Sequence, residues 1–159
     1  MVNDGIESTT TRDDSFGAFY ADRFAALSRL AFLLTGSSEA ADEIAQEACE
    51  QVFRRWDDID YPRAYARSAV ISGSRSWGRR RTVRESAPSE RARFAELDGD
   101  AIAVRVALAD LPERQREVLV LRYYADLKVD DIAVEVGARP GTVKSLIHRG
   151  LARLQEELA

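Results

Sequence analysis

The feature that most constrains the fold is a pair of helical patterns joined by a very short turn, between Val129 and Leu154. The first pattern reads VDDIAVEV, and the second, longer one begins at Pro140 after the three turn residues GAR. Gly137 can adopt the positive φ that a tight turn between helices requires, and proline is favoured at the first position of a helix. The lengths and spacing predict a helix-turn-helix, a motif whose second helix reads the DNA major groove.

The second helix of this motif has one apolar side. Its apolar residues recur every three or four positions, at Val143, Ile147, Leu151, Leu154 and Leu158, so that side must be buried. At 100° per residue, the opposite face carries small, basic and hydrogen-bonding side chains that suit a DNA groove. A solvated helix face is the alternative, and the preceding helix and turn favour DNA. The predicted DNA contacts are Arg139, Gly141, Thr142, Lys144, Ser145, His148 and Arg149.

The rest of the chain also predicts helices, because Glu, Ala, Arg and Leu are frequent and runs of Val, Ile and Thr are lacking. We expect helices over 16–34, from a Ser37 or Ser38 cap to about Trp56, from Pro62 to the arginines at 79–81, over 101–110, and over 112–125. The expected fold class is all-α, with two small helical domains joined by a flexible linker. Its parts are a disordered tail over 1–14, a first domain over 15–82, a linker over 83–99 and a second domain over 100–159.

Charge is strongly segregated along the chain, although the net charge is only −4. Residues 1–60 carry 5 basic and 13 acidic side chains, residues 61–94 carry 9 and 2, and residues 95–159 carry 9 and 12. A basic middle between acidic flanks can bind phosphate locally while an acidic part faces a basic protein. The chain therefore has the charge pattern of an adaptor between nucleic acid and protein.

The basic middle contains the stretch RSWGRRRTVRE, in which arginines surround Trp77. Arginines attract phosphate, and an aromatic ring can stack on an unpaired base. Burial of Trp77 in the core is an equally good interpretation, since large aromatic residues at helical spacing are usually buried.

The helix that follows Ser38 has a mostly acidic face opposite its apolar side. Such a face is unsuited to DNA, and a basic protein surface is its natural partner. Spacing alone does not exclude a merely solvated face. The residues of this face are Asp42, Glu43, Gln46, Glu47, Glu50 and Arg54.

Several classes of function are disfavoured by the residues that are scarce. One cysteine, Cys49, and one histidine, His148, form neither an internal disulfide nor a usual zinc site. No motif places a nucleophile or a paired carboxylate beside His148. We therefore expect no catalytic residue, no metal and no cofactor. The polar start of the chain and the lack of a long apolar run lead us to expect a cytoplasmic protein without membrane insertion.

Two blocks of the sequence resemble one family. The segment LPERQREVLVLRYYADLKVDDIAVEVGARPGTVKSLIHRGLARL resembles the fourth conserved region of extracytoplasmic-function sigma factors, with GTVKS and the His-Arg pair as its most specific part. The earlier stretches EIAQEACEQVFRRWDDI and YARSAVISGSRSWGRRR resemble the second conserved region, most closely in the actinobacterial SigE-like subgroup. The resemblance covers residues 15–82 and 100–159, in the family's order.

This resemblance implies an alternative sigma factor that binds core RNA polymerase and promoter DNA. The fourth region would then read the minus-thirty-five element. The acidic face of six residues around Glu47 would dock on the polymerase. An anti-sigma factor is a further expected partner. The minus-ten element would be contacted by Asp60, Tyr61, Ser72, Arg75, Trp77, Arg79, Arg80 and Arg81.

Four positions depart from the family pattern. Ser72 replaces the usual asparagine, and Lys128 and Arg139 stand where capping Ser or Thr residues are frequent. Leu146 stands where arginine is usual, which removes one expected DNA contact. A stand-alone helix-turn-helix regulator is the alternative function, and the acidic helix argues against it. An enzyme acting on nucleic acid is a third class, for which no site constellation is found.

Overall fold

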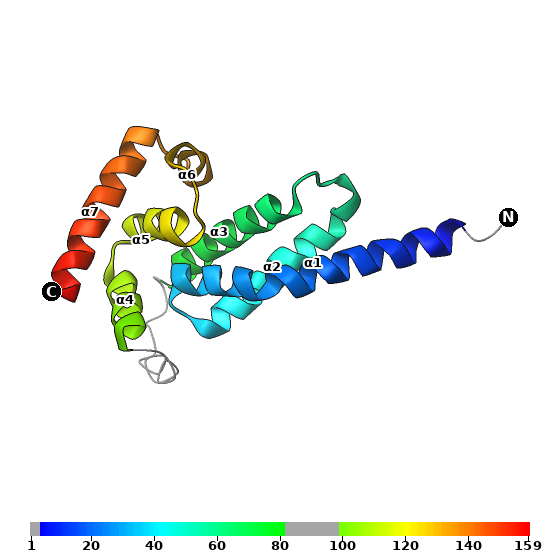
Figure 1. Ribbon diagram of the computed structural model, residues 1–159, viewed down its shortest axis with the longest axis horizontal. Helices are drawn as coiled ribbons and strands as arrows, with labels where there is room; N and C mark the ends of the chain where they lie inside the picture. Colours follow the sequence, from blue (N-terminus) through cyan, green and yellow to red (C-terminus); the bar gives the residue numbers. More distant parts are fainter. Residues whose placement is uncertain (1–3, 82–98) are drawn as a thin grey trace.

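The computed structural model describes residues 4–81 and 99–159 (Figure 1), and every regular element in these two ranges is a helix. The linker predicted at 83–99 lies outside the described residues except for Gly99, which is the first residue of a helix. The elements are α1 Asp4–Thr35, α2 Ser38–Arg54, a 3-10 turn η1 Trp56–Asp58, α3 Pro62–Arg81, α4 Gly99–Asp110, α5 Glu113–Leu119, a π-helical turn η3 Val120–Tyr124, α6 Val129–Val136 and α7 Pro140–Leu158.

The first half of the molecule is a bundle of α1, α2 and α3, each in contact with the other two. Its centre consists of small and branched residues such as Ala31, Ala45, Val52 and Val70, all of which are fully buried. As predicted, Ser37 caps α2, because its side chain accepts a hydrogen bond of 3.1 Å from the Ala40 amide. α2 ends at Arg54, two residues before its predicted end.

Helix α1 begins at Asp4, far before the predicted start at Phe16 and within the expected disordered tail over 1–14. Contacts with the end of α2 and η1 accompany the extension from Arg12 onward. Arg12 donates to the Phe53 carbonyl at 3.0 Å and pairs with Asp57 at 3.1 Å. Further along, the indole N–H of Trp56 donates to Ser15 Oγ at 2.8 Å. These partners are about forty residues away in sequence, so local periodicity does not reveal them.

The second half consists of α4 to α7, and α7 contacts α4, α5 and α6. Its core includes the fully buried Val118, Leu121, Ile132 and Val143. The helix predicted over 112–125 is interrupted, because its last turn is π-helical: the Ala125 amide donates to the Val120 carbonyl, five residues earlier, at 3.1 Å.

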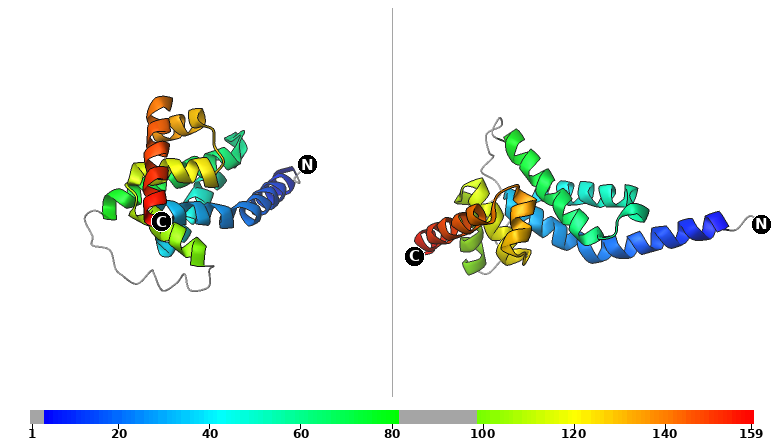
Figure 2. Two further views of the ribbon diagram at one scale, coloured as in Figure 1. Left: turned by 60° about the vertical axis from the view of Figure 1, so that its left-hand side comes forward. Right: turned by 90° about the horizontal axis from the view of Figure 1, so that it is seen from above.

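The two halves pack against each other. α1 contacts α4, α5 and η3, and one continuous cluster of buried side chains extends from Leu27 and Ile71 in the first half to Val118 and Ile132 in the second. Both views in Figure 2 show the second half beside the α1–α3 bundle, with the start of α1 projecting away from it. The fold is all-α, as predicted, with its two helical parts in direct contact.

Candidate nucleic-acid and protein interfaces

The helix-turn-helix is formed by α6 and α7. Gly137 ends α6 with φ 64° and ψ 39°, the left-handed conformation expected of this glycine. Pro140 is the first residue of α7, and Arg139 before it makes no side-chain capping hydrogen bond. Lys128 before α6 makes none either. The turn therefore has the predicted geometry, while the two departures from capping residues leave both helix starts without a side-chain cap.

The buried side of α7 differs in part from the predicted stripe. Val143, Leu146 and Gly150 are buried, whereas Leu158 is 46% exposed. Leu146, at the position where the family usually has arginine, is part of the core at 7% exposure. Leu146 therefore contributes to core packing in this chain, because its side chain points away from the exposed face of α7 that is predicted to contact DNA.

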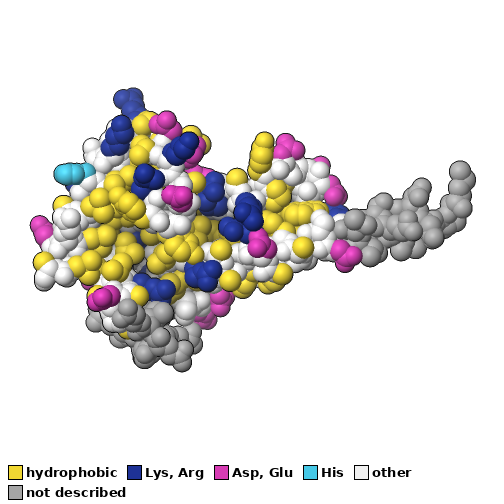
Figure 3. Space-filling model, in the orientation of Figure 1, with side chains coloured by type: hydrophobic (Ala, Val, Ile, Leu, Met, Phe, Trp, Pro, Cys, Tyr) yellow, Lys and Arg dark blue, Asp and Glu magenta, His cyan; other side chains and the backbone are white. Residues whose placement is uncertain are grey.

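The residues predicted to contact the minus-thirty-five element are all exposed: six lie on the outward face of α7, and Arg139 lies directly before the helix. Figure 3 shows Lys and Arg side chains gathered at the end of the molecule where α6 meets α7. Exposure makes this face accessible to a duplex and leaves its basic side chains hydrated. The exposed residues of this set are Arg139, Gly141, Thr142, Lys144, Ser145, His148 and Arg149.

The acidic face of α2 is also fully accessible. Four of its residues have partners within the first half: Tyr20 donates to Gln46 at 2.8 Å, Ser28 donates to Asp42 at 2.5 Å, and Arg54 lies 3.7 Å from Glu50. In the described part of the chain, Glu43 and Glu47 form no ion pair. The pair between Arg54 and Glu50 balances one acidic side chain, so the face keeps an excess of negative charge. Its six exposed residues are Asp42, Glu43, Gln46, Glu47, Glu50 and Arg54.

The residues predicted to contact the minus-ten element are divided by the structure into two sets. Most are exposed, and Tyr61, at 78% exposure, stands just before α3. Arg75 and Trp77, in contrast, are half-buried. The ring of Trp77 packs partly against the core and lies 5.0 Å from the guanidinium of Arg81. The exposed set consists of Asp60, Tyr61, Ser72, Arg79, Arg80 and Arg81.

The basic end of α3 is held in place by hydrogen bonds within α3 and to the end of α1. Arg79 donates to the Ser76 hydroxyl at 3.2 Å, Arg80 donates to the Ser76 carbonyl at 3.4 Å, and Arg81 donates to the Thr35 carbonyl at 3.3 Å. The acceptors of these three hydrogen bonds are neutral groups, and all three arginines are exposed. The end of α3 is consequently a surface that attracts phosphate.

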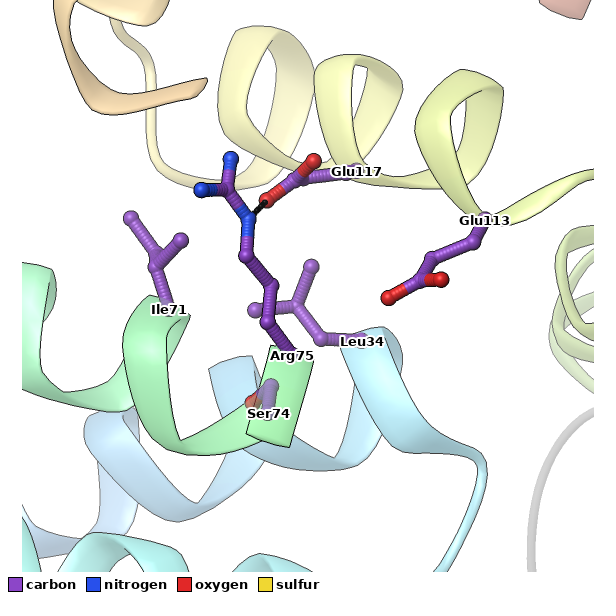
Figure 4. Close-up of a pocket in the computed structure, with 6 residues that line it drawn as sticks. All are labelled: Leu34, Ile71, Ser74, Arg75, Glu113 and Glu117. Atoms are coloured by element: carbon purple, nitrogen blue, oxygen red, sulfur yellow. Dashed lines mark hydrogen bonds and ion pairs between the residues drawn. The ribbon is translucent and has the colours of Figure 1, made fainter. Parts of the chain in front are cut away.

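Arg75 faces the second half of the molecule (Figure 4). Its Nε donates to Glu117 Oε1 of α5 at 2.6 Å, and the Glu117 side chain is only 7% exposed. Glu117 is not among the residues predicted from the sequence, although a signal for it exists. It lies four residues before the buried Leu121, on the apolar side of its helix. A carboxylate in that position requires a partner, and Arg75 supplies it.

No helix within 4–81 or 99–159 is long and apolar enough to cross a membrane. Across the same described residues, no group of three or more His, Cys, Asp or Glu side chains is placed to hold a metal ion.

Comparison with known proteins agrees with this arrangement. The family model described as sigma-70, region 4 matches residues 101–154. The RNA polymerase sigma-E factor of Streptomyces avermitilis is 36% identical over 152 residues, which cover 90% of this chain and 84% of the relative. The RNA polymerase sigma-E factor of Streptomyces coelicolor is 34% identical, with 90% and 85% covered.

Two solved structures share the fold. The sigma factor RpoE in complex with the anti-sigma factor NepR from Bartonella quintana matches with a TM-score of 0.70 at 24% identity, over 91% of this chain and 96% of that one. CnrH in complex with the cytosolic domain of CnrY matches with a TM-score of 0.68 at 23% identity, over 92% and 88%. Because similarity to the sigma-E relatives extends over nine-tenths of its length, the chain belongs to the sigma-70 family of RNA polymerase sigma factors, in the extracytoplasmic-function group.

Proposed function

We propose that the protein works as an alternative sigma factor through three separate surfaces: the acidic face of α2 for core RNA polymerase, the outward face of α7 for the minus-thirty-five element, and α3 with the preceding loop for the minus-ten element. The observation that carries this proposal is the coexistence of an exposed acidic helix face and an exposed basic recognition helix in one chain. An acidic face is unsuited to DNA and is complementary to a basic protein surface, which supports a protein partner in addition to DNA.

The recognition helix has the chemistry that base reading requires. Lys144 and Arg149 are exposed donors that reach guanine edges or phosphates, and the small residues Gly141 and Ser145 allow close approach. Helix-turn-helix proteins contact bases with the first turns of this helix. The proposed role of α7 is therefore to read the upstream promoter element in duplex form.

The end of α3 and the loop before it suit a separated strand. Arg79, Arg80 and Arg81 attract the phosphate backbone, while the exposed ring of Tyr61 can stack on a base. Extrusion of a base costs a few kcal/mol and is offset by contacts in its pocket. We assign this region to the minus-ten element of the nontemplate strand.

We assign two further properties on the family's account. The chain acts in the cytoplasm, where RNA polymerase is found. Its regulation includes an anti-sigma factor, because the RpoE and CnrH structures are both complexes with a second protein, and the partner of RpoE, NepR, is named an anti-sigma factor. Its contribution to transcription is binding and positioning, since its family consists of initiation factors.

Reconstitution with core RNA polymerase tests the proposal. The protein and the polymerase together, but neither alone, should select and open specific promoters from a genomic library. A Gln46, Glu47 and Glu50 to Ala triple variant should lose promoter opening because it removes charge from the polymerase surface. The matched control converts Gln155, Glu156 and Glu157 of α7 to Ala, because these residues are also exposed and include the same one Gln and two Glu.

Equal losses in the two triple variants would remove α2 from the polymerase interface. Tight, sequence-specific duplex binding by the protein alone, without polymerase association, would instead identify a stand-alone regulator.

A further inference from the structure

The loop that connects α2 to α3, residues 55–61, is tied to α1 at its beginning. Arg12 of α1 makes an ion pair with Asp57, with 3.1 Å between Nε and the carboxylate oxygen. The hydroxyl of Ser15 accepts a hydrogen bond of 2.8 Å from the indole N–H of Trp56. Arg12 and Ser15 are three residues apart, so they lie on the same face of α1. That face therefore holds the first part of the α2–α3 loop.

Arg12 also holds the end of α2. Its Nη2 donates to the Phe53 carbonyl at 3.0 Å, and its guanidinium lies 5.3 Å from the centre of the Phe53 ring. The last carbonyl groups of a helix have no partner within the helix, and a positive charge is favourable beside them. One side chain of α1 therefore contacts both the end of α2 and the loop that follows it.

The far end of the loop is tied to α1 as well. Arg63, in the first turn of α3, pairs with Asp22 of α1 at 3.1 Å. Ile59, in the middle of the loop, packs against the hydrophobic core. Asp60 and Tyr61 lie between these anchored points and are exposed, Tyr61 at 78%. The loop thus presents an aromatic ring to solvent while the backbone on both sides of it is held.

The ion pair of Arg12 contributes little to overall stability. The side chains of Arg12 and Asp57 are 34% and 68% exposed, and exposed ion pairs stabilise proteins only weakly. Aromatic packing below the pair joins α1 to the end of α2: the Phe16 ring lies 4.8 Å from that of Phe53 and 5.6 Å from that of Trp56. Loss of the Arg12 charge should therefore leave the bundle folded and change mainly the position of the loop.

We propose that Arg12 is a positioning residue for the minus-ten element, because it fixes the α2–α3 loop so that Tyr61 meets an unpaired base in one orientation. A ring that is already held in place loses less freedom when a base stacks on it. A mobile loop adapts to different partners and discriminates less between them. The inference rests on the proposed function for the role of Tyr61, and on the contacts of α1 for the fixed loop.

The first experiment measures the loop in the full chain without polymerase. Nitrogen-15 relaxation gives the order parameter of the Tyr61 amide, which should be about 0.85 in the wild type and below about 0.6 in Arg12→Gln. The control is Arg29→Gln, which removes the same charge from an exposed residue of α1 that donates to the Tyr124 hydroxyl at 3.3 Å; it should resemble the wild type. Asp57→Asn breaks the same ion pair from the loop side and serves if Arg12→Gln does not fold. An order parameter as high as that of the control would overturn the inference.

The second experiment measures base discrimination by polymerase holoenzyme. Nontemplate-strand oligonucleotides that carry each base in turn along the minus-ten element are bound to holoenzyme made with each variant. Arg12→Gln should reduce discrimination by at least about threefold at the position that Tyr61→Ala affects, and the double variant should lose no more than Tyr61→Ala alone, because one residue acts through the other. Arg12→Lys, which keeps the charge, should retain more discrimination than Arg12→Gln. Losses that add in the double variant, or a loss no larger than that of Arg29→Gln, would overturn the positioning role.

These results separate the inference from the proposed function. If Tyr61→Ala lowers base discrimination and Arg12→Gln does not, the proposed function stands and the positioning role alone is overturned. If Tyr61→Ala leaves discrimination unchanged, the minus-ten role of Tyr61 is rejected, and the positioning role of Arg12 is rejected with it.

Discussion

Gly150 of α7 packs directly against Leu119 of α5. A Cβ built on Gly150 would lie 2.8 Å from Leu119 Cδ1 and 3.2 Å from Leu119 Cγ. Leu119 is itself buried, at 3% exposure, so it has little room to move. The absence of a side chain at position 150 is therefore what allows the recognition helix to sit at its observed distance from α5.

We expect Gly150→Ala to destabilise the protein by about 1–3 kcal/mol through overpacking. The control is Gly17→Ala in α1, where nothing lies within 4 Å of the added Cβ; this change should be stabilising by roughly 0.5–1 kcal/mol. Urea unfolding followed by circular dichroism measures both. An equal or higher stability of Gly150→Ala would show that α7 and α5 are separated more widely than described.

The cap of α2 provides a second prediction. Ser37→Ala removes the acceptor of the Ala40 amide and should lower the free energy of unfolding by about 1 kcal/mol. Ser37→Thr keeps a hydroxyl and should retain most of the stability. Thermal unfolding of the three proteins in parallel measures the effect, and identical midpoints for Ser37→Ala and the wild type would contradict a role for the cap.

Lys144→Ala and Arg149→Ala should weaken binding of holoenzyme to a duplex that carries the upstream promoter element. If the lost contact is to a base edge, we expect a cost of about 1–3 kcal/mol and a weaker sequence preference. If it is to a phosphate, binding to all sequences should weaken, and the slope of log affinity against log salt concentration should decrease in magnitude by about 1. The control is Arg153→Ala, an exposed residue of the same helix beyond its first turns. Fluorescence anisotropy at several salt concentrations separates these outcomes, and an equal loss at Arg153 would argue against base reading by the start of α7.

Cys49 should be unreactive in the native protein. It is 1% exposed, and desolvation by burial raises the pKa of its thiol, so the nucleophilic thiolate is scarce at neutral pH. Because an unfolded thiol ionises near pH 8.5, this group's contribution to stability is present below that pH and decreases as the pH rises above it. Thiol-reactive dye should label Cys49 only after denaturant is added, and rapid labelling of the native protein would contradict the burial.

The sequence predicts those parts of the fold that depend on local chemistry. The Ser37 cap, Pro62 at the start of α3, and Gly137 in the turn of the helix-turn-helix all lie where their backbone preferences place them. The exposed faces of α2 and α7 follow from helical spacing in the same way. Their functions as binding surfaces remain predictions, because exposure alone does not identify a partner.

The elements that the sequence does not predict depend on contacts between distant residues. The early start of α1 coincides with contacts of Arg12 with Phe53 and Asp57, and no local periodicity signals it. The burial of Leu146 depends on how α7 is rotated against α5. The pairing of Arg75 with Glu117 requires that the two halves touch. The sequence does not predict this contact, because a long segment without helical periodicity separates the two helical patterns.

Glu117 holds Arg75 at 2.6 Å where one cluster of buried side chains also joins the two halves. Loss of either half would expose apolar surface of the other to water and would leave a buried charge without its partner. We therefore expect the two halves to unfold together, as one cooperative unit, and not as two independent domains.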